Sequence, residues 1–123
     1  MATTEPIDVL IVDDQAPFRT VARAVVDRVA GWRVVGEAAS GEEALSTAAE
    51  VRPTIVLMDI NLPGINGIEA TRRMLDAEPA VTIVLLSTYA GDDLPADART
   101  CGAVAYVHKD ELTPALLRGL APT

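Results

Sequence analysis

The chain of 123 residues has little of what marks membrane, secreted or nucleic-acid-binding proteins. No apolar run approaches the roughly 18 residues of a membrane span, and the start, MATTEPIDVL, lacks the basic and apolar segments of a signal peptide. A single cysteine, Cys101, cannot form an internal disulfide, so a reducing, cytoplasmic location is expected. With 10 basic against 18 acidic residues and a net charge of −8, direct contact with nucleic acid is not expected.

What the sequence does contain is a regular alternation of apolar runs and amphipathic stretches, which predicts βα units and a parallel sheet. The predicted strands are Ile7–Asp13, Trp32–Ala38, Thr54–Asp59, Val81–Ser87 and Ala103–His108. The length is that of one domain. The pattern favours an α/β, flavodoxin-like (βα)5 fold, a doubly wound parallel sheet in strand order 2-1-3-4-5.

Helices are expected between these strands. The first is predicted to run from about Ala16 to Gly31, with a proline in its first turn. Its apolar stripe is expected to be Phe18, Val21, Ala22, Val25 and Val29. Ser40 and Glu43 fit a capping box at the start of the second helix, and Asn66 is suited to cap the third.

The last two helices are predicted to be weak. The segment Gly91–Gly102 contains Pro95 and few large apolar residues, so its helix should be short and loosely held, with Asp92-Asp93 at its start. Thr113 is the predicted cap of a final helix of barely two turns that begins with a proline.

Polar side chains follow four of the five predicted strands at their C-terminal ends. Asp13 and Asp14 follow the first strand, Asp59 ends the third, Ser87 ends the fourth and Lys109 follows the fifth. In an open α/β sheet, ligands bind outside the carboxyl ends of the strands, and the expected order places the first and third strands side by side. We therefore expect three carboxylates, a hydroxyl and an ammonium to meet at one edge.

These groups together suit phosphoryl chemistry. The Asp59 carboxylate can attack phosphorus and form an acyl phosphate. Because Asp13 and Asp14 add negative charge beside it, a hard cation is needed, and Mg²⁺ favours one or two carboxylates plus phosphate oxygens. Lys109 would offset the phosphoryl charge as a point cation, and Ser87 would donate a hydrogen bond. Each residue alone has an ordinary structural interpretation; their joint position at the strand ends favours the chemistry.

The chain resembles the receiver domain of bacterial two-component response regulators over essentially its whole length. The matching stretches are VLIVDD at 9–14, GEAASGEEAL at 36–45, IVLMDINLPGINGIEAT at 55–71, VLLST at 84–88 and GAVAYVHKDEL at 102–112. The central stretch and the pair Lys109-Asp110 are most similar to the LuxR/NarL-type branch. The resemblance implies one receiver domain over 1–123 with no output domain in this chain, which is either a receiver fragment of a longer transcription factor or a stand-alone receiver.

By position, the resemblance implies a role for each residue at the edge. Asp59 matches the phosphoacceptor, which would receive its phosphoryl group from a phosphohistidine of a sensor histidine kinase. Mg²⁺ would be held by Asp14, Asp59 and the backbone carbonyl of Asn61, with Asp13 acting through a water. Lys109 would complete the catalytic set with the strand-end serine. Such a domain catalyses only its own phosphorylation and dephosphorylation.

The resemblance also implies a switch. Ser87 would move toward the phosphoryl group, and Tyr106 would turn into the space that it leaves. The readout would be the face formed by the segment 91–101, the fifth strand and the last helix, controlling transcription through a DNA-binding domain. We expect this face to be the least ordered part of the domain, and high hydrogen-exchange protection across 91–101 would refute that expectation. A homodimer through the first and last helices, or through this face, is compatible with the resemblance.

Other functions fit the same fold less well. A haloacid-dehalogenase-type phosphatase needs a second acid where Asn61 stands, and a flavodoxin-like electron carrier needs a Ser/Thr/Gly-rich loop where Asp13-Asp14-Gln15 would repel a flavin phosphate. No G-x-x-x-x-G-K-[ST] motif occurs, which excludes a P-loop enzyme. The alternative that stays open is a phosphorylation-independent, receiver-like protein-interaction module, which Mg²⁺ affinity and its loss in Asp14→Asn would distinguish.

Overall fold

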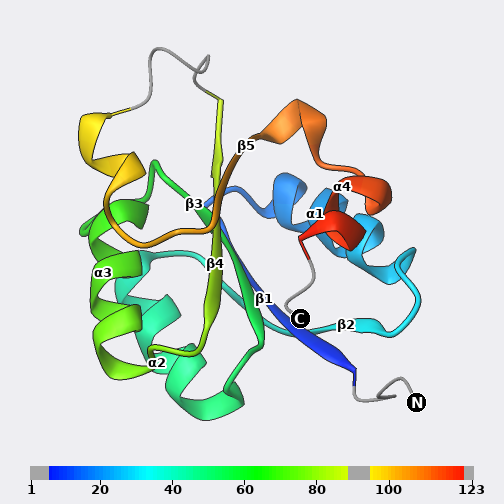
Figure 1. Ribbon diagram of the computed structural model, residues 1–123, viewed down its shortest axis with the longest axis horizontal. Coiled ribbons are helices and arrows are strands. Elements are labelled where there is room, and N and C mark those ends of the chain that lie inside the picture. Colours follow the sequence, from blue (N-terminus) through cyan, green and yellow to red (C-terminus); the bar gives the residue numbers. More distant parts are fainter. Residues whose placement is uncertain (1–5, 89–94, 121–123) are drawn as a thin grey trace.

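A computed structural model of the chain describes residues 6–88 and 95–120 and contains a parallel sheet between two helical layers (Figure 1). The sheet has five strands in the order β2-β1-β3-β4-β5, as predicted, and every neighbouring pair is parallel. The strands are β1 Ile7–Val12, β2 Trp32–Ala38, β3 Ile55–Asp59, β4 Thr82–Ser87 and β5 Ala105–His108. Across the described ranges, no helix is long and apolar enough to pass through a membrane.

The helices cover both faces of the sheet (Figure 1). They are α1 Ala16–Asp27, α2 Gly41–Val51, α3 Gly67–Ala77 and α4 Pro114–Gly119, with short 3₁₀ helices η2 Ala96–Arg99 and η3 Lys109–Glu111. One hydrophobic cluster joins the sheet to α1 and α4, and a second joins it to α2 and α3. Because both faces are covered, the central strands are continuous apolar runs whose residues alternate between the two clusters.

The predicted helix caps are present, with one difference in detail. The Ser40 hydroxyl accepts a hydrogen bond from the Glu43 backbone N–H at 3.0 Å. The Glu43 carboxylate accepts from the N–H of Ala39 at 2.6 Å, one residue before the position that a capping box predicts. The side chains of Asn66 and Thr113 accept backbone N–H groups at the starts of α3 and α4. These caps satisfy donors that the helices cannot satisfy themselves.

The first helix is shorter than predicted, and one of its expected core residues is exposed. It ends at Asp27 rather than near Gly31, which has a positive φ of 84° in the turn before β2. Val21 is 54% exposed, whereas Ala22 and Val26 are fully buried. These two lie four residues apart and define the face toward the sheet, and Val21 lies about 100° around the helix from Ala22. The predicted apolar stripe of α1 therefore wrongly included Val21, which faces solvent.

The C-terminal third also departs from the expected boundaries. The fifth strand begins at Ala105, because Gly102 turns the chain with a φ of 107° and Val104 is 60% exposed. Within the described part of the predicted fourth helix there is only the single 3₁₀ turn η2, in which Ala98 is buried. The expected cap at Asp92-Asp93, and the first part of the face expected to be the least ordered in the domain, lie outside the described residues.

Candidate functional site

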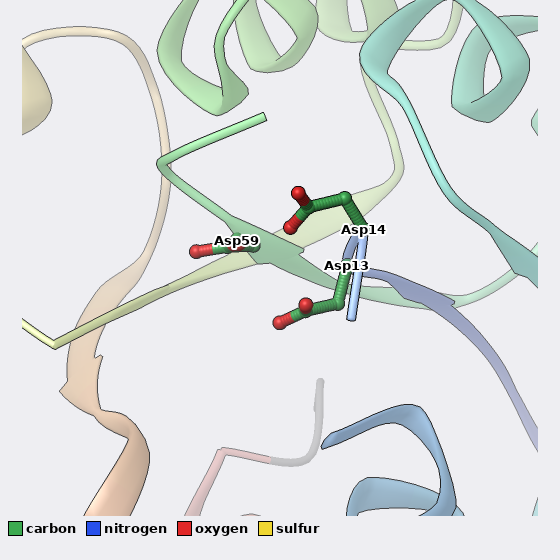
Figure 2. A group of neighbouring side chains, drawn as sticks. All are labelled: Asp13, Asp14 and Asp59. Carbon is green, nitrogen blue, oxygen red and sulfur yellow. The ribbon is translucent and has the colours of Figure 1, made fainter. Parts of the chain in front are cut away.

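Three carboxylates meet at the C-terminal edge of the sheet, where β1 and β3 lie side by side. Figure 2 shows Asp13, Asp14 and Asp59 at the neighbouring ends of these two strands. One oxygen from each lies within 4.8 Å of the others. Asp13 is fully buried and Asp59 is 4% exposed, whereas Asp14 is exposed. The strand order therefore brings together the residues that the sequence predicted to meet, with one side open to solvent.

Lys109 supplies a positive charge to this cluster. It follows β5, and its Nζ lies 2.6 Å from Asp13 Oδ2 and 3.5 Å from Asp59 Oδ2. Its side chain is only 11% exposed, so it is not a solvated surface lysine. The ammonium lies between two buried carboxylates and offsets part of their charge.

The backbone around Asp59 is held by a close approach of α3. A Cβ on Gly67 would lie 2.1 Å from the Asp59 carbonyl oxygen, so no larger residue fits there without a shift of the backbone. The Gly67 N–H donates to the Ile60 carbonyl at 2.8 Å. The Asn61 N–H donates to Asp59 Oδ1 at 3.3 Å. The start of α3 and the turn after β3 together fix the position of the Asp59 carboxylate.

The electrostatics of the cluster favour protonation of Asp59. Burial, followed by the nearby charge of Asp13, raises the pKa of the Asp59 carboxyl from 3.8 to about 6. Lys109 and the hydrogen bond from the Asn61 N–H oppose this rise. The charged form of Asp59 is thus under-compensated by the groups around it. Three carboxylates facing one ammonium form an acidic site whose oxygens suit a hard divalent cation.

The two predicted switch residues lie on the neighbouring strands. Ser87 ends β4 and is 3% exposed, and in the β3–β4 register Asp59 is opposite Leu86. Ser87 therefore comes one residue beyond the position opposite Asp59 on the adjacent strand. Tyr106, on β5, is half-buried against the α2/α3 cluster, with the guanidinium of Arg99 5.7 Å from the ring centre.

Two residues of α1 reach the site, although the sequence predicted neither contact. Arg19 donates from Nη1 to the carbonyl of Asp13 at 2.6 Å and from Nε to Glu37 Oε1 on β2 at 3.0 Å. The ring of Phe18 faces the ammonium of Lys109, whose Nζ is 4.5 Å from its centre. The available signal was the position of both residues in the first turn of the helix that follows the acidic pair.

Comparison with known proteins agrees with this geometry. The family model of the response regulator receiver domain matches residues 9–120. The response regulator GacA of Pseudomonas syringae pv. syringae is 42% identical over 103 residues, covering 84% of this chain and 48% of that protein. This chain thus spans about half the length of the curated relatives it matches.

Solved structures show the same likeness. A LuxR family two-component response regulator from Aurantimonas sp. SI85-9A1 superposes with a TM-score of 0.84 at 36% identity, over 94% of this chain and 81% of that chain. The response regulator domain of Thermotoga maritima CheB gives 0.83 at 31% identity, over 94% of each chain. The first of these supports the resemblance to the LuxR-type branch. The chain belongs to the response regulator receiver domain family.

Proposed function

We propose that this chain is a phosphorylation-dependent signalling switch whose phosphoacceptor is Asp59. The observation that carries the proposal is the juxtaposition of Asp13, Asp14, Asp59 and Lys109 at one edge of the sheet. Family membership supports a place in a two-component system. The phosphoryl donor is a phosphohistidine of a sensor histidine kinase, and the chain works in the cytoplasm without direct contact with nucleic acid.

The chemical step is a phosphoryl transfer to a carboxylate. An Asp59 oxygen forms the new bond to phosphorus while the bond from phosphorus to the histidine nitrogen breaks. The electron pair of that bond stays on the imidazole, which takes up a proton. Lys109 is already within 3.5 Å of Asp59, so its ammonium can pair with the oxygens of the incoming group. The chain acts on no other substrate in this proposal.

Magnesium is the cofactor that this donor set favours. Asp14, Asp59 and the backbone carbonyl of Asn61 would hold the ion, with Asp13 acting through a water. When bound, Mg²⁺ supplies positive charge between the carboxylates and the phosphoryl oxygens. The fit rests on the three carboxylate oxygens within 4.8 Å of one another and on the single ammonium that opposes them.

The switch uses Ser87 and Tyr106. Ser87 moves toward the phosphoryl oxygens, and Tyr106 turns inward into the space that this opens. Since Leu85 pairs with Tyr106 and Ser87 with His108, both switch residues belong to one β4–β5 ladder. The altered face of β5, α4 and the segment before β5 then controls an output, which we propose to be transcription through a DNA-binding domain outside this chain. A homodimer through α1 and α4, or through this face, is part of this proposal.

The test is the intact mass of the chain after incubation with Mg²⁺ and acetyl phosphate, beside Asp59→Asn. We expect one phosphoryl adduct in the wild type, no adduct without metal, and none in the variant. An adduct that persists in Asp59→Asn would overturn the assignment of the acceptor.

A folded wild type that forms no adduct would favour the phosphorylation-independent interaction module. Mg²⁺ affinity separates the two functions further, because a working receiver loses affinity in Asp14→Asn. The interaction module has no such requirement.

A further inference from the structure

In the part of the chain that the structure describes, the ammonium of Lys109 lies close to two carboxylates and to one aromatic ring. Asp13 Oδ2 lies at 2.6 Å and Asp59 Oδ2 at 3.5 Å. The aromatic face of Phe18 has its centre 4.5 Å from Nζ. This distance lies within the range in which a ring quadrupole attracts a cation. Phe18 is the one phenylalanine in the chain.

The ring of Phe18 is held in place by its position at the start of α1 and by its packing against the hydrophobic core. Phe18 lies in the first turn of α1, where its N–H donates to the carbonyl of Gln15 at 3.1 Å. Its side chain is half-buried and packs against the hydrophobic cluster that joins the sheet to α1 and α4. One face of the ring is therefore presented to the site by the packing of the helix.

Contact with the Phe18 ring helps to hold the flexible side chain of Lys109 in one position. A lysine ammonium sits on a four-carbon stem, and holding it at one place costs side-chain entropy. An added carboxylate would hold it too, but would neutralise the charge that an incoming phosphoryl group needs. An aromatic face attracts the cation and leaves its charge in place. It also restricts the access of water to one side of the ammonium.

We infer that Phe18 is a positioning residue for Lys109, holding the ammonium at the acidic edge so that it pairs with a phosphoryl group on Asp59. This inference rests on the proposed function. It adds a residue of α1 to a site that the strand ends otherwise supply.

The test uses beryllium trifluoride as a phosphoryl mimic, with saturating Mg²⁺, on the full chain. For Phe18→Leu we expect affinity for the mimic to fall about 3- to 10-fold, with Mg²⁺ affinity changed less than about 2-fold. Val26→Ala, in the same cluster on the next turns of α1, is the stability-matched control and should bind the mimic like the wild type. Unchanged affinity in Phe18→Leu would overturn the inference.

A series of fluorinated phenylalanines at position 18 keeps the shape of the ring while it weakens the quadrupole. We expect affinity for the mimic to fall stepwise with fluorine number. A flat series would show that the ring acts by packing alone and would overturn the inference even if Phe18→Leu binds weakly. If the wild type neither binds the mimic nor forms an adduct with acetyl phosphate, the proposed function itself fails. If the wild type binds the mimic and forms the adduct, and the Phe18 variants bind the mimic with the same affinity, only the role of Phe18 is refuted.

Discussion

Replacing Asp59 with asparagine is expected to make the metal-free chain more stable at neutral pH. In the folded chain, burial and then the charge of Asp13 raise the pKa of Asp59 from 3.8 to about 6. Folding therefore disfavours the charged form, and the penalty is absent below about pH 3.8, grows as the pH rises and is complete above about pH 6. Asparagine carries no charge, so the variant escapes the penalty at every pH.

The size of the effect follows from the pKa. A rise from 3.8 to about 6 corresponds to about 3 kcal/mol at 1.36 kcal/mol for each pKa unit. Screening by water at the open side of the site, where Asp14 is exposed, reduces this. We expect Asp59→Asn to raise the free energy of unfolding by about 1–2 kcal/mol at about pH 7.5.

The assay is urea unfolding in EDTA at several pH values, followed by circular dichroism. The difference between variant and wild type should shrink toward zero as the pH falls to about 4. Added Mg²⁺ should stabilise the wild type by mass action and the variant much less. Asp27→Asn, at an exposed position on α1, removes the same charge and should change stability by less than about 0.5 kcal/mol. A variant less stable than the wild type in EDTA, or a gain that persists in acid, would refute the reasoning.

Three further substitutions test other parts of the site. Lys109→Met leaves two buried carboxylates without their cation and should lower the free energy of unfolding by about 2–4 kcal/mol in EDTA. Mg²⁺ should restore part of this stability, which urea unfolding with and without metal measures. An unchanged free energy of unfolding in EDTA would contradict the ion pairs. Gly67→Ala forces a methyl group against the Asp59 carbonyl and should cost about 2–3 kcal/mol; an unchanged Tm would rule out the close approach. The hydrogen bond from Arg23 is the main cause that holds the pKa of Glu37 below its usual 4.5. The stabilisation from this pair is thus present above about pH 4.5 and lost as the pH falls further. In Glu37→Gln the free energy of unfolding, measured by urea unfolding at several pH values, should therefore fall less steeply below about pH 4.5 than in the wild type. An equally steep fall would show that the pair does not contribute.

The sheet and the acidic cluster could be predicted because both depend on patterns that are local in sequence. Continuous apolar runs indicate strands covered on both faces, and the polar residues that follow them share one edge whatever the details of packing. The convergence of Asp13, Asp14, Asp59 and Lys109 needed only the strand order. Their roles in phosphoryl transfer stay predictions until the adduct is measured.

The contacts made by α1 could not be predicted in the same way. An apolar residue such as Phe18, at helical spacing, is typical of core packing, and nothing in the pattern shows that one ring face meets a lysine from the far end of the chain. Arg19 is a charged residue of the type found on solvated helix faces, yet it links the carbonyl of Asp13, just after β1, to Glu37 on β2. The end of α1 at Asp27 could not be predicted from the apolar pattern, because Val29, in the turn after the helix, is buried like a helical core residue.

The pair formed by Lys109 and Asp13 spans 96 positions of sequence. A chain that grows from its N-terminus on a ribosome therefore completes all three carboxylates well before it reaches the lysine. Until β5 emerges, the acidic edge has no lysine to oppose it, and docking of β1 against β3 brings like charges together. Formation of the site is thus a late event of synthesis, and a divalent cation bound between the carboxylates during that interval would help β1 and β3 to dock.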